Sequence, residues 1–328
     1  MGTEMKEALL HMLTENEGQF VSGQQISDKL NCSRTAIWKH ISELRNSGYS
    51  IEAVQKRGYR LLTSPDLVTP EEVSLYTGEG SFGKKITFKP SVKSTQEIAH
   101  QLAREGAAEG TIVLADEQTG GRGRLGRAWQ SPSGTGIWMS LIMRPNIPLQ
   151  KAPQLTLLIA VAVSKAIEKV TGIEAAIKWP NDLLINGKKV SGILTELQAE
   201  ADSIHSVIVG IGMNVNQERK HFSEEIIDIA TSLAIEGNQP YKRAAIIGEV
   251  LSEIEKLYHS YLEDGFKVIK LLWEARAFSL GKRITARSIS GSITGYAQGI
   301  TDEGVLLLED DNGVIHSIYS ADIEFPSP

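Results

Sequence analysis

The sequence predicts an α+β protein in three parts: an N-terminal helical module, a central mixed α/β domain and a small C-terminal β domain. Apolar residues recur at helical spacing up to residue 47, and periods of two and 3.6 alternate from residue 69. Only short strand patterns remain after Gly281. We therefore expect domains at residues 1–64, 65–280 and 281–328, with a first linker at Ser64-Pro65-Asp66.

The composition is that of an ordinary folded protein. Of 328 residues, 41% are hydrophobic and 23% are charged, which excludes disordered and fibrous classes. The single cysteine, Cys32, rules out an internal disulfide and favours a reducing compartment. The longest apolar stretch, residues 155–163, is far shorter than the roughly 20 residues that span a bilayer. Because the N-terminus also lacks a secretory pattern, we expect a cytoplasmic protein without membrane association.

Charge is unevenly distributed along the chain. The formal net charge is −6, yet seven basic and only two acidic residues lie between Lys29 and Leu62. Such a stretch favours contact with a polyanion, and a solvated charged face is the alternative. The seven histidines show no spacing typical of metal ligands, so a metal held by the protein alone is not expected.

Three helices are predicted in the N-terminal part, at residues 5–13, 22–30 and 34–47. Ser22 and Gln25 form a capping box at the start of the second helix, and Ser33 caps the third. The third helix is expected to bury Ile37, Ile41 and Leu44, and to point Arg34, Lys39, His40 and Arg45 outward.

Two strands, at residues 49–54 and 58–62, are predicted around a basic tip at residues 55–58. Two helices, a tight turn and a strand hairpin together resemble a winged helix-turn-helix DNA-binding module, whose second helix enters the major groove. The resemblance implies DNA contacts from Ser33, Arg34, Thr35, Trp38, Lys39, His40, Lys56 and Arg57. A scaffold without affinity for DNA is the alternative.

The central part begins with a helix capped by Thr69, with Pro70 at its first position. Further helices are predicted at residues 95–105, 153–170, 224–234 and 241–262. Strands are predicted at residues 86–89, 111–115, 137–143, 175–178, 190–197 and 204–215. Asn186-Gly187 is a type I′ hairpin signal, and the sheet is expected to be largely antiparallel.

The C-terminal part contains four predicted strands, at residues 283–287, 292–300, 304–309 and 314–319. The turns between them fall at Ser290-Gly291, Asp302-Glu303 and Asp311-Asn312-Gly313. Short strands with turns at this spacing predict a small β-barrel.

The most informative segment is the glycine-arginine loop, residues 120–129, which reads Gly-Gly-Arg-Gly-Arg-Leu-Gly-Arg-Ala-Trp. Its glycines let the backbone approach a ligand closely, and Arg122, Arg124 and Arg127 supply forked donors for phosphate or carboxylate. No Gly-Lys-Ser/Thr closes the segment, so it is not a Walker loop. By composition alone, a mobile surface turn is the alternative.

Other motifs accompany this loop. They are Ser94-Thr95-Gln96, Glu117-Gln118-Thr119, Lys178-Trp179-Pro180-Asn181-Asp182, Gly187-Lys188-Lys189-Val190-Ser191-Gly192-Ile193-Leu194 and Gly210-Ile211-Gly212-Met213-Asn214-Val215-Asn216. In this order and spacing they closely resemble biotin protein ligases. With the DNA module in front, the whole chain resembles the bifunctional ligases that also repress the biotin operon, and this implies a C-terminal barrel of the SH3-like kind.

The resemblance implies an ATP-dependent reaction in two steps. The carboxylate of biotin attacks the α-phosphate of ATP, which is accompanied by Mg²⁺, and gives biotinyl-5′-adenylate and pyrophosphate. The adenylate then acylates a lysine of biotin carboxyl carrier protein. In the family the adenylate is also the corepressor, because it favours a homodimer that places two winged helices on operator DNA. Such chemistry needs positive charge in a dry site and a cover that excludes water.

The resemblance also assigns roles to individual residues. Biotin-binding positions are matched by Ser94, Thr95, Gln96, Gln118, Gly121, Arg122, Gly123, Arg124, Lys189 and Gly192. Nucleotide-binding positions are matched by Arg124, Arg127, Trp129, Asn181 and Asn214. Catalytic roles are implied for Lys189 and Arg122 beside the carboxylate and α-phosphate, and for Asp182, which either holds magnesium or orients the acceptor lysine.

Structural alternatives accompany several of these roles. Ser94 is expected to cap the following helix with Glu97 as its capping-box partner, which leaves the hydroxyl of Thr95 free. Asn214 alternatively satisfies a strand end, and Asn181 alternatively shapes a turn. Adjacent strand residues point to opposite faces, so only one of Lys188 and Lys189 enters the site, and we expect Lys189. A repressor without catalysis and a lipoate-type ligase are the rival functions.

Overall fold

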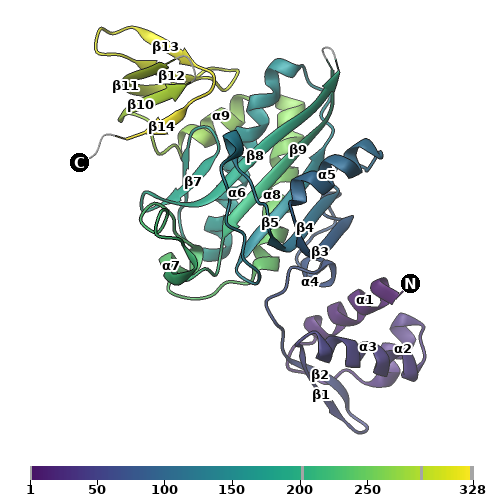
Figure 1. Cartoon of the computed structure of the whole chain (residues 1–328). Coiled ribbons are helices and arrows are strands. Elements are labelled where there is room, and N and C mark those ends of the chain that lie inside the picture. The colour runs from purple at the N-terminus through teal and green to yellow at the C-terminus, as the bar shows by residue number, and fades with distance from the viewer. Residues whose placement is uncertain (1, 201–202, 289–290, 326–328) are drawn as a thin grey trace.

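The computed structural model describes residues 2–200, 203–288 and 291–325. The N-terminal module and the C-terminal β domain lie at opposite ends of the central domain (Figure 1). The predicted α+β fold is confirmed, because a helical module, a helix-covered sheet and an all-β domain follow one another along the chain. Among the described helices, none is long and apolar enough to cross a membrane.

The N-terminal module consists of α1 (Gly2–Glu15), α2 (Gly23–Leu30), α3 (Arg34–Asn46), β1 (Ser50–Val54) and β2 (Gly58–Thr63). The capping box is confirmed, since Ser22 Oγ accepts from Gln25 N–H and Gln25 Oε1 accepts from Ser22 N–H. Asn31 ends α2 in the left-handed conformation, and Ser33 caps α3 three residues after α2 ends. These local bonds fix the turn between the two helices.

The central domain begins with a helix and is built around one seven-stranded sheet. Its helices are α4 (Pro70–Ser74), α5 (Thr95–Arg104), α6 (Ala152–Thr171), α7 (Leu233–Gly237), α8 (Arg243–Asp264) and α9 (Lys267–Glu274), with short 3₁₀ turns η1 (Arg124–Gly126), η2 (Leu149–Lys151) and η3 (Arg219–His221). Its strands are β3 (Ile86–Val92), β4 (Ile112–Gln118), β5 (Gly136–Met143), β6 (Ala176–Lys178), β7 (Asp182–Ile185), β8 (Lys188–Glu200) and β9 (Ser203–Asn214). The strand order is β3-β4-β5-β9-β8-β7-β6. Among the described strands of this sheet, β3 and β4 pair in parallel and every other neighbouring pair is antiparallel, which confirms the largely antiparallel sheet.

The two faces of the sheet differ in what they pack against. On β9, the side chains of Val207, Val209, Ile211 and Met213 join the main core, into which α6 and α8 also pack. The alternate positions of β9 face the other way, and there Ile208 packs against α5. Gly210, Gly212 and Asn214 lie on that second face beyond α5, so the period of two brings small and polar residues to one surface.

The hairpin predicted at Asn186-Gly187 is confirmed, since both residues have positive φ and β7 pairs antiparallel with β8. The helix predicted at residues 224–234 is wrong. Residues 224–229 form turns, and the next residues pair with the start of β8, where Lys189 N–H donates to Ile229 and Thr231 N–H donates to the Lys189 carbonyl. Helix begins only at α7, after Ser232 caps it. Backbone pairing with a distant strand has overridden the local helical pattern.

The C-terminal domain contains β10 (Arg283–Ser288), β11 (Gly291–Ile300), β12 (Leu306–Glu309), β13 (Ile315–Ile318) and β14 (Asp322–Glu324). They form an antiparallel sheet in the order β13-β12-β11-β10-β14, which confirms the small β domain. Within the described part of this domain the strand pairing is open, with β13 and β14 at its edges. The turn predicted at Ser290-Gly291 lies partly outside the described residues. Helix α9 and strand β14 were not predicted from the sequence.

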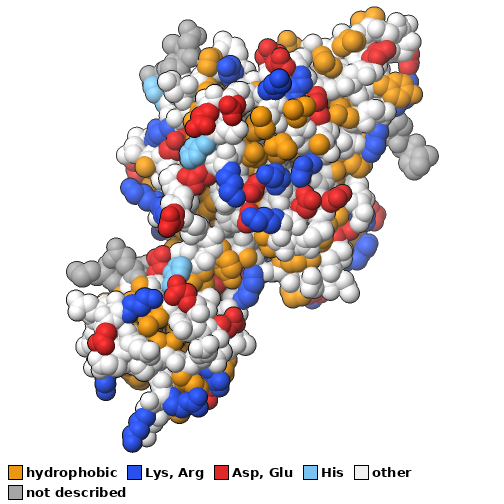
Figure 2. Space-filling model, turned by 180° about the vertical axis from the view of Figure 1, so that it is seen from behind, with side chains coloured by type: hydrophobic (Ala, Val, Ile, Leu, Met, Phe, Trp, Pro, Cys, Tyr) orange, Lys and Arg blue, Asp and Glu red, His pale blue; other side chains and the backbone are white. Residues whose placement is uncertain are grey.

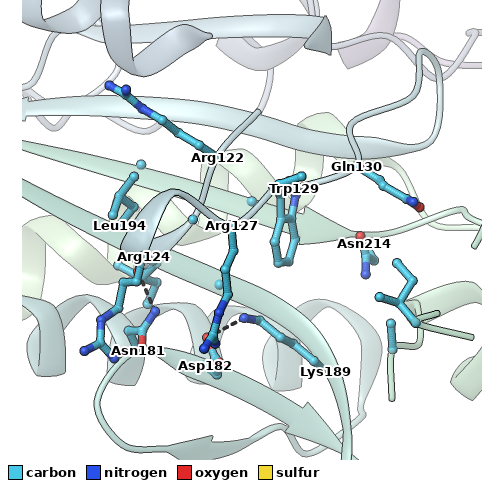
Figure 3. A pocket seen from close by; sticks show the side chains of 18 of the residues that line it. Arg122, Arg124, Arg127, Trp129, Gln130, Asn181, Asp182, Lys189, Leu194 and Asn214 are labelled. Carbon is cyan, nitrogen blue, oxygen red and sulfur yellow. Dashed lines mark hydrogen bonds and ion pairs between the residues drawn. The ribbon is translucent and has the colours of Figure 1, made fainter. Parts of the chain in front are cut away.

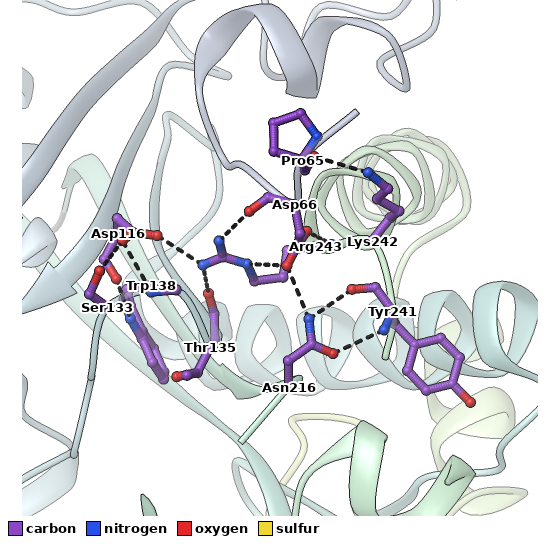
Figure 4. Close-up of polar contacts among 12 residues, drawn as sticks. Pro65, Asp66, Asp116, Ser133, Thr135, Trp138, Asn216, Tyr241, Lys242 and Arg243 are labelled. Atoms are coloured by element: carbon purple, nitrogen blue, oxygen red, sulfur yellow. Dashed lines mark hydrogen bonds and ion pairs between the residues drawn. The ribbon is translucent and has the colours of Figure 1, made fainter. Parts of the chain in front are cut away.

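A polar cluster around the buried Arg243 ties the first linker to the central domain (Figure 4). We call Asp66, Asp116, Asn216, Lys242 and Arg243 the linker clamp. Arg243, which is 1% exposed, donates through Nε to Asp66 Oδ2 at 2.8 Å and through a terminal nitrogen to Asp116 Oδ1 at 3.0 Å. Lys242 donates to the carbonyls of linker residues 64 and 65, and Asn216 donates to Asp66. The linker is therefore fixed along its length.

A second contact joins the same two domains. The hydroxyl of Tyr49, just before β1, donates to Glu72 Oε1 in α4 at 2.6 Å, and both side chains are buried. Burial raises the pKa of Glu72 above its usual value of 4.5, although the bond from Tyr49 and the charge of Lys242 oppose this shift.

Candidate active site

A cavity of about 560 Å³ lies on the second face of the sheet, and we call it the ligand pocket. Strands β8 and β9 form its floor, and the glycine-arginine loop forms one wall (Figure 3). Residues between 217 and 230 also line it. Asp322 and Phe325 of the C-terminal domain also line it. The pocket is therefore assembled from segments that are distant in sequence.

A buried polar network occupies one end of the pocket. Thr95 donates through its backbone N–H and its hydroxyl to Gln118 Oε1, at 2.9 and 3.0 Å. Ser140 donates to Gln96 Oε1 at 2.9 Å and contacts the Thr95 hydroxyl at the same distance. Gln118 donates in turn to Ser131. The structure thus brings together Thr95, Gln96 and Gln118 as expected, and adds Ser131 and Ser140, which sequence analysis missed. Hydroxyls and amides in a dry site suit a neutral polar ring.

Ser94 lies beside this network, but its predicted cap is wrong. It precedes α5 with an extended backbone, and its side chain makes no capping hydrogen bond. The amide of Thr95 is bound by Gln118 instead, and Glu97 pairs with Lys93 at 3.1 Å. A tertiary partner, Gln118, and a local one, Lys93, have replaced the two halves of the capping box, so the Ser94 hydroxyl is available to the pocket that it lines.

Lys189 and Asp182 meet near the middle of the pocket. Lys189 Nζ lies 2.7 Å from Asp182 Oδ1 and 5.3 Å from the centroid of the Trp129 ring. Lys189 lines the cavity whereas Lys188 does not, as strand alternation predicts. Both side chains of the pair retain partial exposure, 33% for Lys189 and 21% for Asp182. The pair therefore combines charge with access for a ligand.

Trp129 lies over two glycines of the floor. Gly192 and Gly212 face each other on β8 and β9. A β-carbon added to Gly212 would lie 2.6 Å from the indole nitrogen, and one added to Gly192 would lie 3.2 Å from the ring. The indole Nε1 is buried and has no hydrogen-bond partner among the described residues. The two glycines thus make room for an aromatic surface inside the pocket.

The three arginines of the glycine-arginine loop point in different directions (Figure 3). Arg122 points away from Lys189, and its guanidinium lies 3.9 Å from Glu196 Oε2. Arg124 donates to Asn181 Oδ1 at 3.2 Å and to Ser320 of the C-terminal domain at 3.1 Å. Arg127 pairs with Asp322. In this arrangement Arg124 and Asn181 are together, whereas Arg122 is apart from the Lys189–Asp182 pair.

Gly121 and Gly123 belong to the same loop. A β-carbon on Gly121 would lie 2.5 Å from the Trp129 carbonyl, so the loop can fold back on itself only with glycine there. Gly123 lines the pocket, and its N–H donates to the Arg127 carbonyl at 2.8 Å. Both residues therefore shape the wall through their backbone.

Lys178 also lines the pocket, although no role beyond membership of its motif was predicted for it. Burial lowers the pKa of its ammonium below 10.5, against the opposing effect of the Asp182 carboxylate. Its Nζ lies 5.9 Å from the Phe325 ring of the C-terminal domain. A shifted pKa beside a carboxylate in a pocket could have been expected only from tertiary structure.

Among the described residues, no group of three or more His, Cys, Asp or Glu side chains is arranged to hold a metal ion. Asp182 is a single carboxylate beside the cavity. One carboxylate together with substrate phosphates is an ordinary Mg²⁺ environment. Asp182 therefore fits a magnesium ion that arrives with a nucleotide.

The N-terminal module presents a separate surface. Ser33, Arg34, Thr35 and Lys39 are exposed on or before α3, and Trp38 is 63% exposed. Lys56 and Arg57 are exposed at the hairpin tip, where Arg57 stacks on Phe20 at 4.2 Å. Lys and Arg side chains gather at the end of the module that lies farthest from the central domain (Figure 2). Cations and an exposed indole on one helix and its wing suit a nucleic-acid duplex.

His40 does not belong to that surface, and its predicted outward orientation is wrong. It is 9% exposed, and its Nδ1 lies 2.9 Å from Glu43 Oε2. His40 follows Ile37 by three residues and precedes Leu44 by four, so it falls on the apolar stripe of α3.

Comparisons with known proteins agree with this geometry. The Biotin/lipoate A/B protein ligase family matches residues 88–214, an HTH domain matches residues 6–60, and the Biotin protein ligase C terminal domain matches residues 279–325. Bifunctional ligase/repressor BirA of Bacillus spizizenii is 52% identical over 99% of both chains, and that of Bacillus subtilis is 51% identical over the same shares. A biotin protein ligase from Aquifex aeolicus in complex with biotin and ATP superposes with a TM-score of 0.64 and 36% identity, over 74% of this chain and 98% of that one.

Proposed function

This chain belongs to the family of bifunctional biotin ligases and repressors, and on that premise we propose that it activates biotin with ATP and transfers it to a carrier protein. An oxygen of the biotin carboxylate attacks the α-phosphorus, and the bond to the bridging oxygen of pyrophosphate breaks. The neutral amine of a lysine on biotin carboxyl carrier protein then attacks the biotinyl carbonyl, and AMP leaves. The products are biotinylated carrier, AMP and pyrophosphate.

The observation that carries this proposal is the order of chemistry along the pocket. The dry network of Ser94, Thr95, Gln96 and Gln118 suits the ureido ring of biotin. Lys189 follows at the middle, where the carboxylate and α-phosphate meet and negative charge accumulates. Gly192 and Gly212 leave space there for the Trp129 indole, which forms an aromatic surface beside both ligands.

The glycine-arginine loop covers the joined product in this proposal. Gly121 and Gly123 let it close, and Arg122 and Arg124 bind the carboxylate and phosphate when the ligands are present. Nucleotide contacts come from Arg127, Trp129, Asn181 and Asn214. Asp182 holds the magnesium ion of Mg-ATP, which neutralises phosphate charge.

The second activity is repression of biotin genes. Biotinyl-5′-adenylate acts as the corepressor and favours a homodimer, and two winged helices then bind operator DNA more tightly than one. Contacts come from Ser33, Arg34, Thr35, Trp38, Lys39, Lys56 and Arg57. Operator DNA and ATP as partners imply a cytoplasmic site of action.

Incubation of the pure protein with ATP, labelled biotin and a carrier domain tests the ligase activity. We expect label on the carrier, pyrophosphate release that requires biotin, and no transfer when lipoate replaces biotin. Transfer of lipoate instead of biotin would identify a lipoate-type ligase. Sedimentation with and without biotin plus ATP tests the homodimer, and a sedimentation coefficient that does not change would contradict ligand-dependent assembly.

A further inference from the structure

One corner of the ligand pocket combines two carboxamides with apolar side chains. Asn214, Gln217, Phe222, Ile226 and Ile229 line it, and we call them the amide corner; His221, Ser223 and Glu225 of the same segment also line the pocket. Asn214 lies beside the Trp129 indole, at the end of the pocket away from Arg122 and Leu194 (Figure 3). Apolar walls with a few convergent polar atoms suit a flat heterocycle.

The hydrogen bonds of this corner fix the orientation of both amides. Asn214 Nδ2 donates to the Thr231 carbonyl at 3.0 Å, so the Asn214 oxygen must point the other way. That oxygen accepts from Gln217 Nε2 at 3.1 Å. A flip of the Gln217 amide would place its oxygen against the Asn214 oxygen. Asn214 cannot flip at the same time, because its nitrogen donates to the Thr231 carbonyl. The nitrogen of the Gln217 amide therefore faces Asn214, and its oxygen, Oε1, is directed away from Asn214.

Gln217 Oε1 has no hydrogen-bond partner within the described ranges. The residue is 2% exposed, and the Ser232 hydroxyl holds its backbone carbonyl at 2.6 Å. A buried carbonyl oxygen without a donor is unfavourable, so a ligand that supplies an N–H at this place gains affinity. Of the two substrates, ATP carries an exocyclic amine on a flat ring.

We propose that Gln217 determines the base specificity of the nucleotide, accepting a hydrogen bond through Oε1 from the 6-amino group of adenine. This inference rests on the proposed use of ATP. A purine with an oxygen at position 6 presents a second acceptor to Gln217 and is rejected, and a purine without a substituent there leaves Oε1 unpaired.

The experiment compares ATP, inosine triphosphate and purine riboside triphosphate in the full-length protein. The rate of biotin-dependent pyrophosphate release gives kcat and KM for each nucleotide. Gln217→Met removes the acceptor and keeps the side-chain length. Gln239→Met is the matched control, because Gln239 is exposed and outside the pocket. Thermal unfolding checks that both variants fold.

We expect the wild-type protein to use purine riboside triphosphate about tenfold less efficiently than ATP, and inosine triphosphate less efficiently still. In Gln217→Met the KM for ATP rises about tenfold, the value for purine riboside triphosphate stays within about a factor of two, and the KM for biotin is unchanged. The control keeps the wild-type ratio. A folded Gln217→Met variant that keeps the ratio of ATP to purine riboside triphosphate would overturn the inference.

Calorimetric binding of the same nucleotides, with and without biotin, separates this inference from the proposed function. If the wild-type protein binds ATP more tightly than the other two nucleotides and Gln217→Met abolishes that preference, the inference stands even without biotin-dependent turnover. In that case the ligase proposal alone fails. If turnover occurs with equal use of all three nucleotides, the ligase proposal stands and the role of Gln217 is wrong.

Discussion

The ligand pocket and the linker clamp are both polar and both pair cations with carboxylates, yet they differ in how completely their groups are bonded. In the clamp, Arg243 binds two carboxylates and the carbonyls of Asp66 and Gly136. In the pocket, Trp129 Nε1 and Gln217 Oε1 are buried without partners in the described structure. A saturated cluster holds the fold, whereas an unsaturated one is suited to a ligand that completes it.

Exposure separates the two regions in the same way. The side chain of Arg243 is 1% exposed, whereas that of Lys189 is 33% exposed. Removing Arg243 leaves two carboxylates, whose side chains are 27% and 25% exposed, without the buried cation that they share, whereas removing Lys189 leaves the single carboxylate of Asp182. Substitutions should therefore affect stability in the clamp and activity in the pocket.

Arg243→Met gives the largest expected effect. Asp66 and Asp116 lose their common partner, and we expect a loss of roughly 3–5 kcal/mol in the free energy of unfolding, measured by urea denaturation. Arg276→Met is the control, because Arg276 pairs with the exposed Glu168 at 3.0 Å and should cost about 1 kcal/mol or less. Equal losses in the two variants would show that the clamp is no more than a surface ion pair.

Lys189→Ala tests the ligand pocket, where we expect a loss of activity and not of stability. We expect adenylate formation to fall at least about a hundredfold, which corresponds to about 2.7 kcal/mol in the barrier, whereas the melting temperature changes little. Pyrophosphate release measures the first quantity and thermal unfolding the second. A near-normal rate would remove Lys189 from the reaction.

Tyr49→Phe tests the second contact between the domains. Because burial raises the pKa of Glu72, stability from this group is fully present below pH 4.5 and is lost as the pH rises through the folded-state value. Removing the Tyr49 hydroxyl raises that pKa further. We expect a loss of about 2 kcal/mol near pH 7 and a smaller loss near pH 4, from denaturation curves at both values. A loss independent of pH would exclude ionisation of Glu72 as the cause.

Gly212→Ala tests whether the position of the Trp129 indole matters for nucleotide binding. The new methyl group would lie 2.6 Å from the indole nitrogen, so Trp129 must leave the floor. We expect the KM for ATP to rise about tenfold, or about 1.4 kcal/mol. Gly192→Ala should have a smaller effect, since its nearest contacts lie at 3.2 Å. Equal KM values in Gly212→Ala and the wild type would show that the indole position is irrelevant to the nucleotide.

The sequence predicted the features whose cause is local. Ser22 and Gln25, or Asn186 and Gly187, lie within a few residues of their partners, so the pattern contains the whole interaction. The pocket residues were named through motifs, and the network of Thr95, Gln96 and Gln118 came together as expected.

The rest depends on partners far along the chain. Arg243 binds Asp66 and Asp116, which are 177 and 127 residues away, and no local pattern marked it. Tertiary partners also explain the errors at Ser94, whose neighbour Thr95 binds Gln118, and at residues 224–234, where Ile229 and Thr231 bond to Lys189. Gln217 was not predicted, because only the tertiary structure shows that its amide nitrogen is bonded and its amide oxygen is not.

The fixed linker has a consequence for the DNA that this protein reads. Hydrogen bonds to Asp66 and from Lys242 hold the linker, so in the proposed homodimer the two winged helices would stand at one separation and rotational setting. B-form DNA turns once in about 10.5 base pairs, and an insertion of about five base pairs between half-sites moves one of them to the opposite side of the duplex. In that proposed dimer, the linker clamp would determine the half-site spacing that the protein accepts.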